Sequence, residues 1–223
     1  IARQPDLGTS LLIGASGVYV LFFSGLRVML LKNKWLNLLL LSGMFGGSLF
    51  LAWNYFLIAY QKRRILTLFN PESDPLGSGY HIIQSKIAIG SGGLTGKGVA
   101  KGSQSQLDFV PEQSTDFIFS VLAEELGFLG VLLLIIIYSL IIYRCLILSL
   151  RCEDNFSRLL GASLTFVFFT YIFVNIGMVS GLLPVVGVPL PLISYGGSSL
   201  ITLMASFGII MSIHKHKGPR YLQ

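Results

Sequence analysis

Five long apolar stretches dominate the sequence and constrain its fold more than any other feature. They cover residues 8–26, 36–58, 117–143, 157–179 and 190–213. About 20 mostly apolar residues in a helix cross a hydrocarbon core of about 30 Å, and each stretch has about that length or more. The chain is 53% hydrophobic and only 12% charged, unlike soluble globular domains or disordered chains. We therefore predict an all-α, polytopic transmembrane helix bundle with five spans, forming a single membrane domain over residues 1–223.

Basic residues gather beside the ends of the predicted spans. The three clusters are Arg27, Lys32 and Lys34; Arg144, Arg151 and Arg158; and Lys215, Lys217 and Arg220. With five spans all three clusters fall on one side of the membrane, which the positive-inside rule assigns to the cytoplasm. The net charge of +6 is thus a topology signal, and no basic face interleaved with aromatic residues indicates nucleic-acid binding.

This orientation places one large polar segment, residues 60–115, on the extracytoplasmic side. Its basic residues 62–64 then disagree with the positive-inside rule. Because basic and apolar residues alternate over residues 60–69, we interpret this part as an amphipathic helix on the outer membrane surface. The following residues 77–102 are rich in glycine, which predicts a tightly folded re-entrant or cavity-lining loop.

Part of this loop, GSGGLTGKG at residues 90–98, has some features of a nucleotide-binding P-loop. The pattern fails in two places, because it requires glycine where this chain has Ser91 and Ser or Thr where it has Gly98. A nucleotide site is therefore not expected. Backbone amides together with Lys97 or Lys101 could instead hold a pyrophosphate.

Three carboxylates lie near the start of the third predicted span. Ser114 or Thr115 is placed to cap the helix, with Asp116 in the first turn, where the helix dipole favours negative charge. Spacing alone leaves open whether Asp116 only caps the helix or is functional. Glu124 and Glu125 lie one to two turns deeper, where an ionised carboxylate needs a partner. Since Glu124 follows Asp116 by eight residues, we expect both on one helix face, lining a polar cavity that opens outward.

Residues 175–198 contain three prolines next to the fifth predicted span. A broken helix at membrane depth is tolerated only where protein or a water-filled cavity satisfies the freed backbone. An ordinary turn would explain Pro184 and Gly187 but not the small residues further along. Those residues, which favour close approach of helices, are Ser194, Gly196, Gly197 and Ser198.

The cysteines and histidines do not form a recognisable metal-binding pattern. Cys145 and Cys152 lack a CxxC spacing and a nearby histidine, so we expect free thiols in a packed helix. His81 stands alone, and His214 and His216 lie in a basic tail, so none is expected to be a ligand. No protein metal site is predicted.

Four motifs, in this order, resemble the SEDS family of bacterial envelope proteins (shape, elongation, division and sporulation). They are QPDLGTS at 4–10, ESDPLGSGYHIIQSKIAIGSGG at 72–93, GSQSQLDFVPEQSTDFIFSVLAEELG at 102–127, and the proline-glycine segment 175–198. The amino-acid sequences of these motifs resemble those of the elongation member of the family more than those of the division member. The family has ten spans, so the resemblance implies that these five are the last five. We expect the 223-residue form to be inactive by itself.

The resemblance implies a peptidoglycan glycosyltransferase of the bacterial cytoplasmic (inner) membrane that polymerises lipid II during cell elongation and rod-shape maintenance. It also implies partners, namely the elongation machinery and a class B penicillin-binding protein that supplies the transpeptidase. The family's essential aspartate falls on Asp116. As a general base, this residue would accept the proton of the sugar hydroxyl that attacks the anomeric carbon, with inversion.

Other residues would then bind the substrate. The departing pyrophosphate needs positive charge, which lysines or a divalent cation such as Mg²⁺ or Mn²⁺ could supply. Acidic and amide side chains at the outer mouth of the first span and inside the third could line the same cavity. The candidate substrate-binding residues are Lys86, Lys97, Lys101, Glu124, Gln4 and Asp6.

Two alternative functions predict different properties. A lipid II flippase would place ionisable groups near the membrane midplane with access to both faces, whereas Asp116 and the lysine-bearing loop are predicted toward the outside. A non-catalytic scaffold for the penicillin-binding protein predicts that Asp116→Asn leaves growth unaffected.

Overall fold

The computed structural model describes residues 7–24, 47, 50–75, 77–106 and 114–215, and the regular elements within these ranges are helical. The longer helices are α1 (Leu7–Phe23), α3 (Ala59–Phe69), α4 (Ser78–Ser91), α6 (Ile118–Leu150), α7 (Asn155–Val179) and α8 (Gly197–Lys215). Shorter elements are the π-helical η1 (Ala52–Phe56), the 3₁₀ turn η2 (Pro71–Ser73) and α5 (Ser103–Gln106).

Three of these helices, α6, α7 and α8, are long and apolar enough to cross a membrane. They match the third, fourth and fifth predicted spans, and α1 matches the first. The prediction of a polytopic all-α membrane protein is thus confirmed, while most of the second predicted span lies outside the described residues. The fifth helix begins at Gly197 rather than near residue 190, because Pro189 and Pro191 do not support regular helix there.

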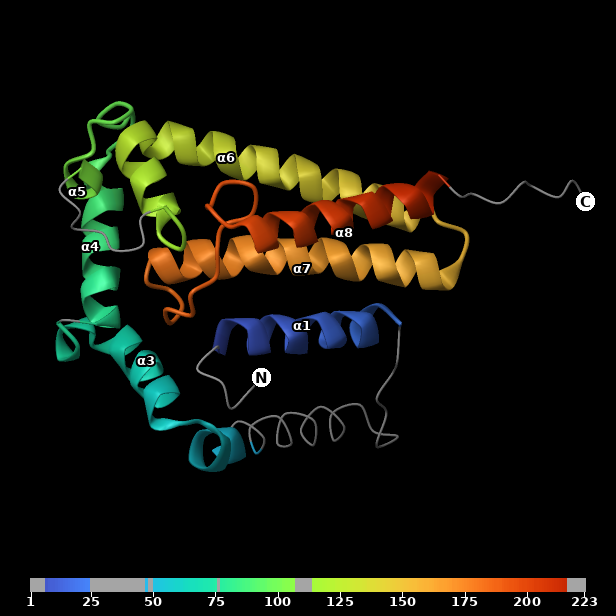
Figure 1. Ribbon diagram of the computed structural model, residues 1–223, viewed down its shortest axis with the longest axis horizontal. Coiled ribbons are helices and arrows are strands. Elements are labelled where there is room, and N and C mark those ends of the chain that lie inside the picture. The colour runs from blue at the N-terminus through green and yellow to red at the C-terminus, as the bar shows by residue number, and fades with distance from the viewer. Residues whose placement is uncertain (1–6, 25–46, 48–49, 76, 107–113, 216–223) are drawn as a thin grey trace, which may run out of the picture.

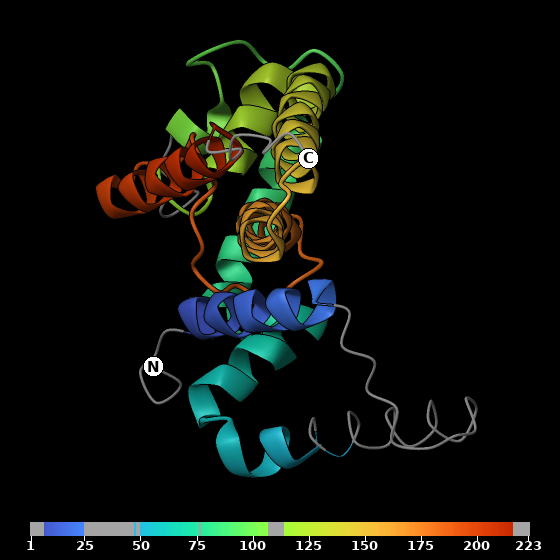
Figure 2. The same cartoon turned by 90° about the vertical axis from the view of Figure 1, so that its right-hand side faces the viewer.

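Helix α7 forms the centre of the bundle. It packs against α1, α6 and α8, as Figures 1 and 2 show from two directions. Half of its most apolar window is buried, compared with 17% for α6 and 6% for α8. The outer faces of α6 and α8 are therefore available to lipid or to other membrane helices.

One end of the bundle is covered by α3, α4 and the loop that follows α4, which belong to the polar segment between the second and third predicted spans. Helix α4 crosses this end at a steep angle to α6 and α7, and α3 continues from it (Figure 1). The amphipathic helix predicted over residues 60–69 is present as α3, and it ends at Asn70, before Pro71. The opposite end of the bundle holds the junction of α6 and α7, with Arg151 and Arg158, and the last turn of α8, with Lys215.

Helix α6 bends sharply at Gly127. The backbone there has φ 64° and ψ −164°, a conformation that essentially only glycine adopts. The amides of Phe128 and Leu129 bond to the carbonyls of Gly93 (2.9 Å) and Leu94 (3.1 Å) in the glycine-rich loop. Figure 1 shows the first turns of α6 bent away from the long rod. Residues 128–150 alone are long enough to span a hydrocarbon core of about 30 Å at about 1.5 Å per residue.

The bend corrects the expected position of two carboxylates. Glu124 and Glu125 precede Gly127, so they lie in the short first segment of α6 and not one to two turns inside the long apolar rod. The prediction of free thiols is confirmed for both cysteines, which are buried. Cys145 lies in α6 as predicted, whereas Cys152 follows the end of that helix.

Candidate functional site

Asp116 lies in a turn immediately before α6, held by the segment that joins α7 to α8. The carbonyl of Ser114 accepts a hydrogen bond from the Tyr195 amide (2.9 Å), and that of Thr115 from the Ser194 hydroxyl (2.5 Å). The helix begins only at Ile118, with Phe117 as its N-cap. The prediction that Ser114 or Thr115 caps a helix containing Asp116 is therefore wrong, because residues 114–117 form a turn whose carbonyls bind the α7–α8 segment.

The middle of the α7–α8 segment, residues 185–191, is largely buried although it is not helical. Val186, Val188 and Leu190 are at most 6% exposed. Side chains satisfy its backbone: Asn175 donates to Val188 O (2.6 Å), Tyr138 to Pro191 O (2.6 Å) and Arg64 to Val185 O (2.8 Å), while Ser194 accepts from the Leu190 amide (2.7 Å). The interpretation of residues 175–198 as a break whose backbone is satisfied by protein is thus confirmed.

Gly187, in the same segment, places its backbone close to the Asp116 carboxylate. A Cβ placed on Gly187, whose φ is +73°, would lie 3.3 Å from Asp116 Oδ2. The predicted close helix approach at Gly197 is wrong, since a Cβ there would meet nothing within 4 Å. The glycine that allows close approach to a candidate functional group is Gly187.

Helix α4 contributes two further side chains to this end of the bundle. The ring of His81 stacks on Phe117, the residue after Asp116, with centroids 5.5 Å apart and planes 18° apart. Lys86 reaches Gly181, because its amine occupies the space where a Cβ on that glycine would lie. Ser85 ties α4 to the end of α7 by donating to Val179 O (2.8 Å). Lys86 and Asp116 therefore contact opposite ends of one stretch, residues 181–187.

Glu124 is fully buried in a separate cluster that it forms with the glycine-rich loop. Its Oε1 atom lies 2.7 Å from Lys97 Nζ. The same atom accepts hydrogen bonds from Ser103 Oγ (3.1 Å) and from the backbone amide of Gln104 (3.0 Å). The carboxylate is 0% exposed, whereas the Lys97 side chain is 29% exposed. Lys97 therefore neutralises a buried charge, and Glu124 has protein partners instead of facing an open cavity.

Glu125 completes the attachment of the loop to α6. Its carboxylate accepts from the Ala100 amide (3.0 Å), and its carbonyl accepts from the Gly98 amide (3.0 Å). Lys101 is exposed beside this loop. Residues 92–101 are thus tightly folded against the first segment of α6, as their glycine content predicted. The prediction of a loop over residues 77–102 is wrong for residues 78–91, which form helix α4.

The predicted site residues therefore fall into different surroundings. Helical spacing does not relate Asp116 to Glu124, because Asp116 lies outside the helix. Gln4 and Asp6 lie outside the described residues. Asn175, whose amide donates to the Asp116 carbonyl (2.8 Å), was missed as a site residue. Its position inside a long apolar stretch is the signal that could have identified it.

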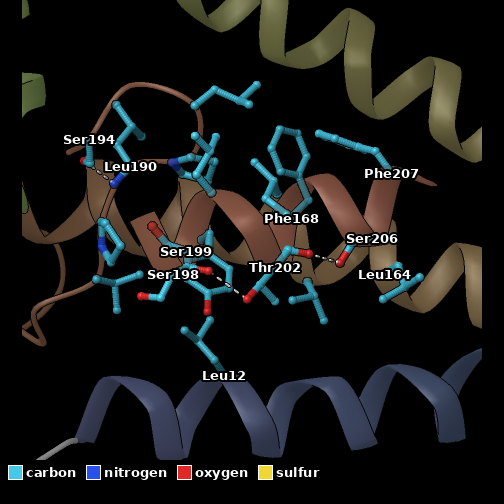
Figure 3. A pocket seen from close by; sticks show the side chains of 18 of the residues that line it. Leu12, Leu164, Phe168, Leu190, Ser194, Ser198, Ser199, Thr202, Ser206 and Phe207 are labelled. Atoms are coloured by element: carbon cyan, nitrogen blue, oxygen red, sulfur yellow. Dashed lines mark hydrogen bonds between the residues drawn. The ribbon is translucent and has the colours of Figure 1, made fainter. Parts of the chain in front are cut away.

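A cavity of about 380 Å³ lies between α1, α7 and α8, next to the Asp116 turn. Gly187 and Ser194, which contact that turn, also line the cavity. Figure 3 shows Leu12 of α1 facing Phe168, Phe207 and a row of hydroxyls on α8. In that row, Thr202 and Ser206 donate to carbonyls of α8 itself, so the cavity wall is largely apolar. Within the described parts of the chain, no three His, Cys, Asp or Glu side chains gather as a metal site.

Comparison with known proteins identifies the family. The family model for the cell cycle proteins FtsW, RodA and SpoVE matches residues 1–218. The chain belongs to this family. The FtsW/RodA/SpoVE family includes the peptidoglycan glycosyltransferase MrdB of Escherichia coli K12, which is 55% identical over 217 residues, covering 97% of this chain and 57% of MrdB. The peptidoglycan glycosyltransferase RodA of Treponema pallidum is 46% identical over 155 residues, covering 70% of this chain and 36% of RodA.

A solved structure in the same family shows the same fold. It describes a peptidoglycan synthase complex that coordinates polymerization and crosslinking, and it matches with a TM-score of 0.73 and 36% identity. The match covers 99% of this chain and 58% of that chain. The chain thus spans a little over half the length of the E. coli relative and of the solved structure.

Proposed function

We propose that the protein is an inverting peptidoglycan glycosyltransferase that polymerises lipid II at the outer face of the bacterial cytoplasmic membrane during cell elongation. The observation that carries this proposal is the placement of Asp116. Its carboxylate lies beside Gly187 at the end of the bundle that is opposite the basic α6–α7 junction, on a turn held by the α7–α8 segment. The 55% identity to a peptidoglycan glycosyltransferase supports the reaction class.

In the proposed reaction Asp116 is the general base. The 4-hydroxyl oxygen of an N-acetylglucosamine forms a bond to the anomeric carbon of the donor while the bond from that carbon to the lipid pyrophosphate breaks. The electron pair leaves with the pyrophosphate, and the hydroxyl proton moves to the Asp116 carboxylate. A single displacement of this kind inverts the configuration of the anomeric carbon.

The surroundings of Asp116 fit a lipid-linked, anionic donor. The cavity between α1, α7 and α8 lies beside the Asp116 turn, and its largely apolar wall suits the isoprenoid chain of such a donor. Among the three candidate lysines, Lys86 is the best placed to stabilise the pyrophosphate, because it contacts the same 181–187 stretch as Asp116. Lys97 is paired with Glu124.

We further propose that the protein acts with a class B penicillin-binding protein. A solved relative is a synthase complex in which polymerization and crosslinking are coordinated. In this proposal the transpeptidase partner supplies the crosslinking activity and this protein the polymerisation.

The test is Asp116→Asn in the intact protein, purified in detergent and supplied with lipid II. Asparagine keeps the shape of the side chain and removes its basicity, so glycan formation should fall by at least about a hundredfold. Detergent removes the membrane, so a flippase would make no glycan with either form. Polymerisation by Asp116→Asn at near the unmodified rate would refute the general-base assignment.

A further inference from the structure

Asn175 lies where the last turns of α7 meet the Asp116 turn and the α7–α8 segment. The side chain is 0% exposed. Its Nδ2 atom donates to two backbone carbonyls, those of Asp116 (2.8 Å) and Val188 (2.6 Å). One amide group therefore joins two chain segments that lie far apart in the sequence.

The orientation of this amide is set by its two acceptors. Both Nδ2 hydrogens are used, and Oδ1 accepts no hydrogen bond from the described residues. Rotating the amide by half a turn would bring Oδ1 against two carbonyl oxygens, which would repel it. The contribution of Asn175 is therefore to donate two hydrogen bonds, and a residue without two donors cannot replace it.

The two carbonyls belong to the backbone that defines the surroundings of the carboxylate. Val188 follows Gly187, whose missing side chain leaves room for Asp116 Oδ2. Because the Asn175 amide donates to both Asp116 O and Val188 O, it fixes the position of the Asp116 turn relative to residues 187–188. A shift of about 1 Å in a reacting group can lower a rate about a hundredfold.

We infer that Asn175 is a positioning residue for catalysis: it holds the Asp116 turn on the α7–α8 segment so that the carboxylate points at the attacking hydroxyl. This inference rests on the proposed function of Asp116 as general base. Asn175 itself is buried and acts through Asp116, without touching the substrate.

The test uses Asn175→Asp and Asn175→Ala in the intact protein, with lipid II polymerisation measured per folded molecule. Aspartate has nearly the same volume but donates at most one hydrogen bond, and alanine donates none. We expect kcat to fall at least about tenfold in both variants while KM stays within about twofold, since substrate contacts remain. Thr165→Val is the matched control, because Thr165 is equally buried on α7 but donates only to Gly161 O in its own helix.

Each outcome decides the question. Unchanged kcat in a folded Asn175 variant overturns the inference, and so does failure of both variants to fold, which would show a purely structural role. A loss of activity in Thr165→Val equal to that in the Asn175 variants would also overturn it. Asp116→Asn measured alongside separates the two proposals: if it stays active, the general base is wrongly assigned, whereas an inactive Asp116→Asn with active Asn175 variants refutes only the positioning role.

Discussion

At the scale of single residues, the fold around the glycine-rich loop depends on the fully buried Glu124 carboxylate and the lysine that neutralises it. An acidic residue in an apolar stretch must be paired, and this expectation is met by Lys97 at 2.7 Å. The partner could not be predicted, because Lys97 is 27 positions away on a loop whose path depends on glycine conformations. The same loop lysine was expected to bind pyrophosphate, a role that stays a prediction.

Substitutions of the pair should separate these two roles of Lys97. Lys97→Met leaves the carboxylate buried without a cation and should lower the free energy of unfolding by about 3 kcal/mol. Glu124→Gln should cost less, because the 29% exposed lysine can turn toward water. Denaturant unfolding of the detergent-solubilised protein measures both. A Lys97→Met protein of normal stability that makes no glycan would instead assign Lys97 to substrate binding.

Gly187 is a second residue whose role follows from its backbone. With φ at +73° and its missing Cβ 3.3 Å from Asp116 Oδ2, Gly187→Ala adds strain of about 1–2 kcal/mol and crowds the carboxylate. We expect reduced polymerisation together with lower thermal stability. The control is Gly197→Ala, where a Cβ meets nothing within 4 Å and activity should be retained. Equal activity of the two variants would show that Gly187 tolerates a side chain.

At the scale of elements, the long apolar helices and the break between α7 and α8 were predictable from sequence, and the bend inside α6 was not. Hydropathy over about 20 residues identified the positions of α1, α6, α7 and α8 within a few residues, except at the end of α6 and the start of α8. The bend in α6 depends on one glycine inside an apolar pattern, and such a glycine is usually accommodated in a regular helix. Its unusual conformation is imposed by the loop amides and carbonyls that meet it, which hydropathy does not report.

Gly127→Ala should therefore be far more disruptive than an ordinary glycine substitution. A Cβ at residue 127 would overlap the backbone at Gly96 and Leu94, and the ψ of −164° with positive φ is strained for alanine. We expect loss of folded protein, or a melting temperature lowered by several degrees. Gly90→Ala in α4, where nothing lies within 4 Å, should be neutral or slightly stabilising. Similar melting temperatures for the two variants would contradict the rigid attachment of the loop.

At the scale of the whole molecule, the antiparallel bundle places function and topology signals at opposite ends. The end crossed by α4 carries the Asp116 turn and the glycine-rich loop, and the other end carries the basic α6–α7 junction. The positive-inside rule assigns the basic end to the cytoplasm. The proposed reaction requires the Asp116 end to face outward, where a lipid-linked sugar donor would be polymerised.

Cysteine labelling tests this orientation directly. Lys101→Cys and Glu153→Cys introduce thiols at exposed positions on the two ends, and the native Cys145 and Cys152 are buried. A membrane-impermeant thiol reagent added to cells with an intact cytoplasmic membrane should modify position 101 and spare position 153, which should react only after that membrane is opened. The unsubstituted protein controls for reaction at the native cysteines. Labelling at 153 but not at 101 would invert the topology, and it would place Asp116 on the side of the membrane where the proposed extracytoplasmic polymerisation does not occur.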